Sequence, residues 1–327
     1  MILVNLLQDQ SSQNKYVSNT LIKELNETLK KGKKAIIYIN KKGEYSSLIC
    51  ENCKKIFKCK NCDSSLNIHG ESMICHICGY SEKLKQKCDN CDSEKLLKVG
   101  VGTEQIEKAL KNIFPKKYIF RFDTESVKNK TLKINSLETL SKAEIIIGTK
   151  MLTTGFDFDS IGLVTVVLIE QELQIAKYNS EEKLYTNIKQ LLGRGERKGE
   201  KTNFIIQSFI PENETIKMIC EDNYKNFFIK SLKERKLFNY PPFCEYAILE
   251  YRNENKQKAL DYSKNLKNKL DNLNTDKKIE IIFVENSFKK FNKFHYKIIL
   301  KGQNLRYFLK NIKTEIFNNG NLSLIFE

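Results

Sequence analysis

The sequence predicts an α/β protein in which a parallel sheet is interrupted by a cysteine-rich insertion and followed by a smaller α+β domain. Three observations predict this architecture. Up to residue 210, helical segments alternate with short apolar strands, which is typical of a parallel sheet. Eight of the ten cysteines lie between Cys50 and Cys91, inside that alternating pattern. From Pro211 onward the order of elements changes to β-α-β-β-α-β, a ferredoxin-like pattern.

The alternating part of the chain predicts a sheet that helices cover on both faces. Apolar residues at helical spacing predict a helix over residues 16–31, which Gly32 ends. Further helices are predicted to begin at Thr103 and to cover residues 131–142 and 181–192. Because the alternation resumes after the cysteines, we interpret the cysteine-rich stretch as an insertion. The predicted strands are residues 34–40, 118–123, 143–149, 162–170 and 202–209.

The eight clustered cysteines form four C-x-x-C pairs. A C-x-x-C turn presents two thiolates together, and two such turns complete a tetrahedron around zinc, so the stretch predicts two structural Cys₄ sites. A disulfide framework would need an oxidising compartment, and the apolar start of the chain lacks the basic residues and cleavage site of a secretory signal. A thioredoxin-like redox centre would use one pair rather than four. The pairs are Cys50/Cys53, Cys59/Cys62, Cys75/Cys78 and Cys88/Cys91.

Two pairs per ion allow three arrangements of the zinc ligands. Twelve residues separate the two inner pairs, which suits one zinc-ribbon hairpin, whereas only five separate the first two pairs. We therefore favour a nested arrangement. His69 and His76 are alternative ligands, but with eight cysteines available we interpret them as surface or supporting residues. The outer zinc would be held by Cys50, Cys53, Cys88 and Cys91, and the inner zinc by Cys59, Cys62, Cys75 and Cys78.

Composition indicates a globular protein with an anionic partner. Hydrophobic residues make up 40% and charged residues 29% of the 327 residues, which allows two or three domains. The net charge of +16 favours nucleic acid, although a lysine-rich proteome would also produce such a surplus. No apolar run reaches the length of a membrane span, and no targeting segment is recognisable, so we predict a cytoplasmic protein without membrane contact.

The last part of the chain, residues 211–327, carries 22 basic and 15 acidic residues and no recognisable catalytic constellation. It is predicted to begin with a helical segment over residues 212–238, which ends before the turn at Pro241 and Pro242. The predicted strands that follow are residues 244–252, 279–285, 292–301 and 321–327, and the helices between them are residues 255–272 and 303–316.

Two loops of the α/β part have residues suited to phosphate. Residues Gly148 to Phe158 follow a predicted strand at the carboxyl end of the sheet, where such folds bind ligands. Gly148 and Gly155 permit close backbone approach, and Thr149 offers a hydroxyl. In the second loop, Arg194 and Arg197 follow a predicted helix in a glycine-rich turn, although such arginines are also common as solvated turn residues.

Read in order, the motifs of this chain resemble the PriA family of replication-restart DNA helicases. They start with an asparagine-basic-basic-glycine stretch and the four C-x-x-C pairs. G-x-G-T-E, G-T-x-M-L-x-x-G-x-x-F, Q-x-x-G-R-x-x-R and a Pro-Pro turn follow. The matching residues are Asn40 to Gly43, the eight cysteines, Gly100 to Glu104, Gly148 to Phe158, Gln190 to Arg197, and Pro241/Pro242.

The resemblance implies three domains. Residues 1–48 and 99–210 would form a RecA-like second helicase lobe, residues 49–98 an inserted double-zinc module, and residues 211–327 a PriA-type C-terminal domain. By the same resemblance, Gln190, Arg194 and Arg197 would face the ATP phosphates. Gly148, Thr149, Gly155 and Gly193 would couple the nucleotide cleft to DNA. The implied partners are forked or single-stranded DNA and primosome proteins.

The sequence also departs from the family pattern. It contains no G-x-x-x-x-G-K-[ST] phosphate loop and no DEAH-type box for Mg²⁺, which the family's first lobe supplies. We therefore expect ATP and Mg²⁺ to act only with a separately supplied first lobe, and this chain alone to be inactive. Glu196, Thr154 and Asn179 replace a glycine, a lysine and an arginine common in the family. The alternative is a non-catalytic, zinc-containing DNA-binding scaffold.

Overall fold

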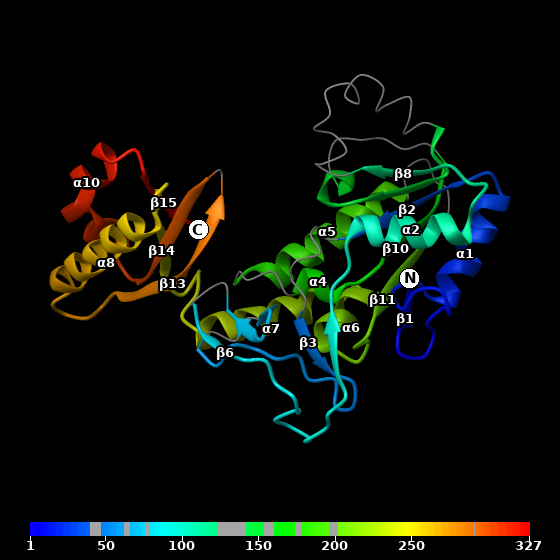
Figure 1. Ribbon diagram of the computed structural model, residues 1–327, viewed down its shortest axis with the longest axis horizontal. Helices are drawn as coiled ribbons and strands as arrows, with labels where there is room; N and C mark the ends of the chain where they lie inside the picture. The colour runs from blue at the N-terminus through cyan, green and yellow to red at the C-terminus, as the bar shows by residue number, and fades with distance from the viewer. Residues whose placement is uncertain are drawn as a thin grey trace.

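The computed structural model (Figure 1) describes residues 1–39, 47–61, 66–75, 79–122, 142–153, 160–173, 178–195, 202–290 and 292–327. Its largest sheet has six strands, and every neighbouring pair in it is parallel, as the sequence predicted. In spatial order the strands are β1 (Ile2–Asn5), β11 (Asn203–Ser208), β10 (Ile161–Val166), β2 (Lys34–Tyr38), β9 (Ile145–Gly148) and β8 (Ile119–Phe122).

Three longer helices connect these strands: α1 (Asn19–Lys30), α2 (Thr103–Ile113) and α5 (Ser180–Gly195). Helices α1 and α2 lead toward the β8 edge, whereas α5 leads back toward the β1 edge. Right-handed crossovers therefore place α5 on the opposite face of the sheet from α1 and α2. Helix α1 starts later than the apolar pattern predicted, because the Ser18 hydroxyl caps it by accepting a hydrogen bond from the Leu21 N–H at 3.0 Å.

Three further features of this part of the chain differ from the sequence prediction. The apolar N-terminus forms β1, an edge strand that the sequence pattern did not predict. Strand β10 ends at Val166, and Glu170 begins a short helix, α4 (Glu170–Leu173), instead of ending the strand. Helix α5 continues through Gly195, so Arg194 belongs to the helix and does not follow it. The predicted helix over residues 131–142 lies almost entirely outside the described residues.

The cysteine-rich stretch leaves and rejoins the parallel sheet through an antiparallel ribbon. Strand β3 (Ser47–Cys50) pairs with β7 (Leu96–Val99), and Cys50 lies opposite Leu96 at the end of the ribbon. This pairing brings the first and last C-x-x-C turns together. Inside the stretch, a separate sheet is formed by β4 (Asn67–His69), β5 (Ser72–Ile74) and β6 (Ser81–Lys83).

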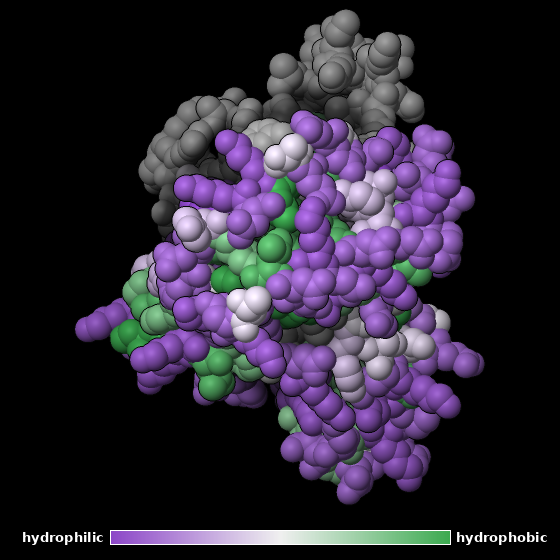
Figure 2. Space-filling view, turned by 90° about the vertical axis from the view of Figure 1, so that its left-hand side faces the viewer, coloured by the Kyte–Doolittle hydropathy of each residue, from purple (hydrophilic) through white to green (hydrophobic). Residues whose placement is uncertain are grey.

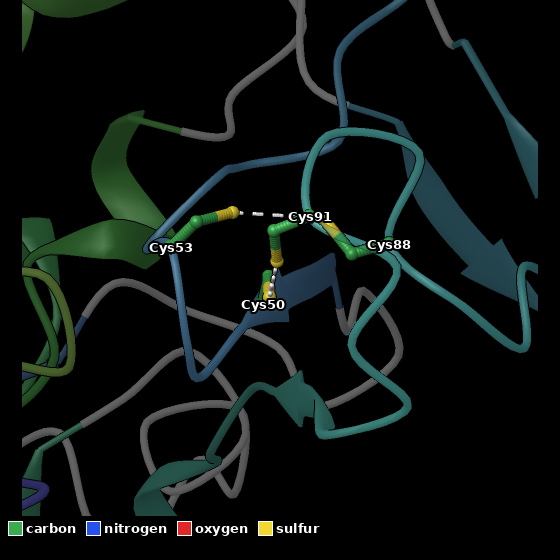
Figure 3. Close-up of side chains that lie close together, drawn as sticks. All are labelled: Cys50, Cys53, Cys88 and Cys91. Atoms are coloured by element: carbon green, nitrogen blue, oxygen red, sulfur yellow. Dashed lines mark hydrogen bonds between the residues drawn. The ribbon is translucent and has the colours of Figure 1, made fainter.

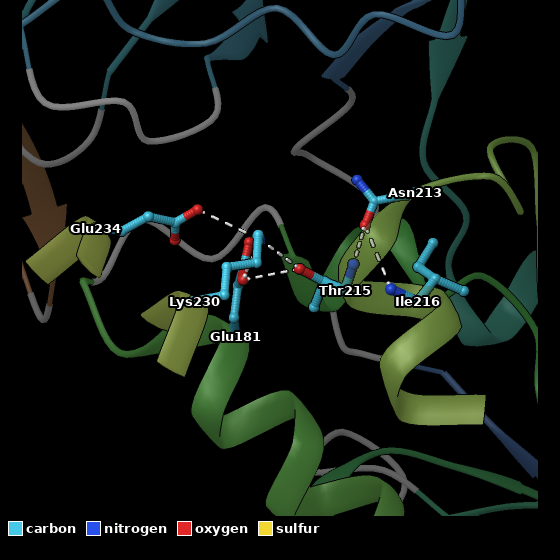
Figure 4. A network of polar contacts seen from close by, with 6 residues as sticks. All are labelled: Glu181, Asn213, Thr215, Ile216, Lys230 and Glu234. Carbon is cyan, nitrogen blue, oxygen red and sulfur yellow. Dashed lines mark hydrogen bonds and ion pairs between the residues drawn. The ribbon is translucent and has the colours of Figure 1, made fainter. Parts of the chain in front are cut away.

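Two helices join the parallel sheet to the rest of the chain: α6 (Glu214–Cys220) and α7 (Tyr224–Leu237). The sequence predicted one helical segment, but Asp222 adopts a left-handed φ of 58° and Asn223 caps a new helix. A polar network fixes both helices to the start of α5 (Figure 4). Glu181 accepts a hydrogen bond from the Thr215 hydroxyl at 2.9 Å, and its carboxylate lies 3.4 Å from the Lys230 ammonium.

The C-terminal sheet is antiparallel, with the strand order β13-β14-β12-β15. Its strands are β12 (Glu245–Asn253), β13 (Glu280–Lys290), β14 (Lys293–Gly302) and β15 (Leu322–Phe326). Helix α8 (Lys256–Leu273) joins β12 to β13, and α9 (Leu305–Phe308), the 3₁₀ turn η3 (Leu309–Ile312) and α10 (Lys313–Asn318) join β14 to β15. This is the predicted β-α-β-β-α-β order, with the last predicted helix divided into three pieces.

The outer side of this C-terminal part is predominantly hydrophilic, as Figure 2 shows for the side that carries α8 and α10 in Figure 1. No helix among the described residues is both long enough and apolar enough to span a membrane.

The cysteine-rich stretch and the C-terminal sheet share one hydrophobic cluster. Leu48, Cys50 and Cys88 belong to it together with Tyr246 and Ile299 of the C-terminal sheet. Gly79 makes the approach possible, because a Cβ atom there would lie 3.2 Å from the Glu285 backbone nitrogen on β13. The two parts of the chain therefore share this cluster, while the C-terminal sheet forms a second cluster with its own helices.

Aromatic stacking extends the shared cluster toward the start of α5. The Tyr178 and Tyr240 rings stack at a centroid distance of 5.0 Å, and the Arg235 guanidinium lies 5.3 Å from the Tyr178 ring. The Tyr178 ring, which precedes α5, also lies 5.4 Å from the Tyr246 ring of β12, and this contact ties the start of α5 to the C-terminal sheet.

Candidate metal centre and the carboxyl edge of the sheet

Four cysteine sulfurs converge at the end of the β3–β7 ribbon (Figure 3). All four Sγ atoms lie within 4.8 Å of one another, and both Cys50–Cys91 and Cys53–Cys88 have Sγ–Sγ distances of 3.6 Å. A disulfide would require about 2.05 Å. A tetrahedron with zinc–sulfur bonds of about 2.3 Å has edges of about 3.8 Å. The donor set and its spacing therefore fit one zinc ion, held by the cysteines that the nested arrangement groups together.

The local backbone explains why each pair of thiols points the same way. In the first turn, the Cys50 N–H donates to the Lys55 carbonyl at 3.0 Å and the Lys54 N–H donates to the Cys50 carbonyl at 3.0 Å. In the last turn, Cys88 exchanges the corresponding bonds with Ser93 and Asp92, both at 2.9 Å. Lys54 and Asp92 both have left-handed φ angles, 62° and 55°. The two turns thus have the same backbone conformation, and both direct their thiols toward the centre of the four-cysteine cluster.

The four thiols differ in their ionisation. Burial raises the pKa of Cys53, but hydrogen bonds from the Lys55 N–H and the Asn90 side chain outweigh it and lower the pKa to about 6. Burial raises the pKa of Cys88 to about 11. The Ser93 N–H lowers the pKa of Cys91. Metal binding must therefore displace protons from some thiols, and zinc affinity should fall as the pH falls.

The inner cysteines are described only in part. Cys59 and Cys75 are buried in the shared cluster, whereas Cys62, Cys78 and His76 lie outside the described residues. The Cys75 turn repeats the backbone pattern of the outer turns: its N–H donates to the Tyr80 carbonyl at 2.8 Å, and the Gly79 N–H donates to the Cys75 carbonyl at 3.0 Å. Gly79 has a φ of 80°. His69 is exposed on β4 and does not belong to the four-cysteine cluster.

Gly148 and Thr149 lie where the sequence predicted them, at the carboxyl end of β9. Thr149 is buried, and the 3₁₀ turn η1 (Lys150–Thr153) follows it. A Cβ atom on Gly148 would come within 2.7 Å of both the Phe122 carbonyl oxygen and the Leu152 side chain. The fold itself therefore requires glycine at this position. Gly155 lies outside the described residues.

The predicted phosphate-facing residues and Gly193, which is predicted to couple the nucleotide cleft to DNA, lie at the end of α5 or directly after it. Gln190 and Gly193 are exposed, and a Cβ atom on Gly193 would meet no described atom within 4 Å. Glycine in a helix costs roughly 1 kcal/mol relative to alanine, so packing within the described residues does not explain Gly193. Arg194 follows it within the helix, and Arg197 lies outside the described residues.

Gly148 and Gly193 allow the same substitution to be compared at a packed position and at an open one. We expect Gly148→Ala to lower the free energy of unfolding by about 1–3 kcal/mol, because the added methyl group overpacks against backbone. Gly193→Ala should leave stability unchanged or raise it by up to about 1 kcal/mol, because the methyl group enters open space in a helix. Urea unfolding of the zinc-loaded protein measures both. Equal destabilisation by the two substitutions would contradict the packing argument.

Sequence reasoning missed a buried polar cluster at the same edge of the sheet. Glu170 is fully buried, and its Oε1 accepts hydrogen bonds from the Ser208 hydroxyl and the Phe209 N–H, both at 2.6 Å. Glu172 accepts a hydrogen bond from the Tyr38 hydroxyl at 2.5 Å. Burial raises the pKa of both carboxyls. The available signal was an acidic E-x-E directly after an apolar run, which is unusual at the carboxyl end of a buried strand.

Comparison with known proteins adds evidence of ancestry. No family model matches the chain. It is 30% identical over 262 residues to replication restart protein PriA of Bacillus subtilis, covering 79% of this chain and 32% of that protein. With PriA of Chlamydia pneumoniae the identity is 32% over 253 residues, covering 74% and 33%. With PriA of Chlamydia trachomatis it is 27% over 325 residues, covering 96% and 42%.

The alignments have two features in common. Each covers most of this chain, and the compared proteins share one name. The chain spans about a third of the length of the first two relatives. The family resemblance inferred from the ordered motifs is therefore confirmed: the chain is a homologue of replication restart protein PriA that corresponds to part of it.

Proposed function

We propose that this chain is the second lobe and C-terminal domain of a PriA-type ATP-dependent 3′–5′ DNA helicase that acts in primosome assembly and replication-fork restart. The second lobe would comprise residues 1–48 and 99–210, with a zinc module at residues 49–98 and a C-terminal domain from residue 211. The observation that carries the proposal is the similarity to PriA over most of the chain. The parallel sheet, with Gly148 and Thr149 at the carboxyl end of β9, supports it.

The nucleotide site would use residues at the end of α5 and directly after it. Gln190, Arg194 and Arg197 would face the ATP phosphates, and arginine suits this role because its fixed charge can neutralise a transferring phosphoryl group. Gly148, Thr149, Gly155 and Gly193 would link the nucleotide cleft to the DNA strand. The phosphate loop and Mg²⁺ would come from a first lobe that this sequence does not contain.

The cysteines would have a structural role in this helicase. Cys50, Cys53, Cys88 and Cys91 would hold one zinc, and Cys59, Cys62, Cys75 and Cys78 a second. A site closed by four thiolates leaves no position for water, so each ion would hold chain segments together and would not catalyse. The repeated backbone pattern of the Cys75 turn supports the second site. The assembled module would engage forked DNA and primosome proteins.

A second candidate function is a non-catalytic, zinc-containing DNA-binding scaffold. The placement of Glu196 between Arg194 and Arg197 favours it, because a carboxylate there would compete with phosphate for the arginines. Both candidates require DNA binding, which the net charge of +16 supports.

ATP hydrolysis separates the two candidates. We expect the zinc-loaded chain alone to show no DNA-stimulated ATP hydrolysis, because this sequence contains no phosphate loop to hold the nucleotide. Mixing it with a separately expressed PriA first lobe from the same genome should restore hydrolysis. Turnover by the chain alone would contradict the need for a first lobe. A silent mixture that still binds forked DNA would favour the scaffold.

A further inference from the structure

The two faces of the C-terminal sheet have different neighbours. Ala247, Leu249 and Tyr251 of β12 share a hydrophobic cluster with Leu266 and Leu270 of α8. Successive residues of a strand point to opposite faces, so the intervening residues of β12 face away from the helices. Residues directly opposite each other in an antiparallel pair share a face. The register therefore defines a helix-free face of this sheet, which includes Tyr246, Ile248, Glu250 and Arg252 of β12 and Lys293, His295, Lys297 and Ile299 of β14.

The cysteine-rich stretch covers only one end of the helix-free face. Tyr246, Val284 and Ile299 belong to the cluster shared with the cysteines, and Ile248 packs against it. Gly79 contacts β13 at Val284 and Glu285. Beyond Val284 and Lys297, which lie opposite each other, no described residue of β12, β13 or β14 belongs to the shared cluster. The end of the face near the β13–β14 hairpin thus lies outside this apolar contact.

Basic residues gather at this second end. Arg252 is exposed and lies opposite His295, and Lys293 and Lys297 flank His295 on the same strand. The one acidic residue among these positions, Glu250, is already paired: its carboxylate lies 2.8 Å from the His295 Nδ1 and 3.7 Å from the Lys297 ammonium. The Arg252 guanidinium also donates to the Gly320 carbonyl at 3.2 Å, which holds its stem in place. The patch is therefore positive and partly preorganised.

We propose that Arg252, Lys293 and Lys297, the hairpin patch, bind the phosphate backbone of single-stranded DNA. This assignment rests on the proposed function, because it locates the DNA contact within it. Charge complementarity carries the argument: the three cations outnumber the single carboxylate of Glu250, so these four side chains together carry a positive charge. Alternate residues of a strand are about 7 Å apart. Lys293 and Lys297 are four residues apart on β14, so they lie about 14 Å apart along the strand, a distance that an extended chain of phosphates can span.

The patch contains no side chains arranged to read bases, so binding should be independent of sequence and dominated by salt. For single strands, each phosphate contact contributes about 0.7 to the slope of log affinity against log salt. Three lost contacts should therefore reduce the magnitude of that slope by about 2.

The test compares two triple variants of the zinc-loaded full chain with equal change in charge. The patch variant is R252Q/K293Q/K297Q. The control variant is K256Q/K258Q/K264Q, which changes exposed lysines of α8 on the other side of the sheet. Fluorescence anisotropy with a labelled oligothymidylate measures binding across a salt series. K293E alone is a further variant, because partly exposed Lys293 can change without disturbing the core.

At about 50 mM salt, we expect the affinity of the patch variant to be at least about tenfold below that of the wild-type chain. The magnitude of its slope of log affinity against log salt should be smaller by about 2, while the control variant keeps the wild-type slope. K293E should show a smaller loss in the same direction. Equal losses in both triple variants would overturn the patch and leave DNA binding intact as a general property of the charge. Absence of binding by the wild-type chain would overturn the proposed DNA function and the patch with it.

Discussion

Replacing Cys88 by serine is expected to release one zinc ion per chain and to destabilise far more than the turn that contains it. The Cys88 sulfur lies 3.6 Å from that of Cys53 in a cluster of four. Three thiolates do not close a structural zinc site, and structural zinc contributes on the order of 10 kcal/mol to the folding of small zinc modules. We expect the zinc content of the Cys88→Ser protein to be lower than that of the wild-type chain by at least one ion per chain.

The shared hydrophobic cluster makes the effect extend to the C-terminal sheet. Cys50 and Cys88 are packed in one cluster with Tyr246 and Ile299. If the ribbon end unfolds, those side chains lose their cover, and apolar surface near the β12–β14 pair becomes exposed to water. Limited proteolysis should therefore cut within residues 47–99 and near α7, and a dye for exposed apolar surface should bind more strongly than to the wild-type chain.

Cys220→Ser is the matched control. Cys220 lies in α6, outside the four-cysteine cluster. Its substitution should keep the wild-type zinc content and the wild-type proteolysis pattern. Wild-type zinc content in the Cys88→Ser protein would show that these four thiols do not hold a metal. Loss of zinc with an unchanged proteolysis pattern would instead contradict the dependence of the C-terminal sheet on the metal centre.

The sequence predicted most of the parallel sheet because its strands are continuous apolar runs. Residues 145–148 are all buried, and no polar residue interrupts the pattern. The same rule misplaced the end of β10, because the apolar residues Val167 to Ile169 extend the run although the strand has ended. Buried donors beyond the strand, such as the Phe209 N–H, set the position of Glu170, and a local pattern contains no information about them.

Some features of the site could be predicted from the sequence, whereas others depend on contacts between distant parts of the chain. The spacing of the cysteines predicted which four belong together, because loop lengths restrict pairing. Gly148 was recognised as special, but its reason is the Phe122 carbonyl on a neighbouring strand, and sequence alone does not place that atom. The contact between the cysteine-rich stretch and the C-terminal sheet depends on how three parts of the chain are placed in space. The hydrophobic periodicity of the sequence contains no information about the placement of these parts.

Arg194→Ala is expected to reduce ATP hydrolysis by the reconstituted two-lobe mixture on the order of a thousandfold, because arginines that neutralise a transferring phosphoryl group contribute at least that much to turnover. The prediction rests on the placement of Arg194 directly after Gly193, in the last turn of α5. The contacts of Glu181 with Thr215 and Lys230 hold the opposite end of α5 in place.

The control for Arg194 is Arg306→Ala, which removes the same charge from the C-terminal part of the chain. Arg306 is exposed in α9, and its guanidinium lies 4.7 Å from the Phe326 ring. It should leave hydrolysis unchanged. Both variants should keep wild-type zinc content and unfolding midpoint, so that a loss of turnover reports on chemistry. If Arg194→Ala hydrolyses ATP as fast as the wild-type mixture, the arginine does not serve the nucleotide. The similarity to PriA would then reflect ancestry, and the scaffold function would be the better description.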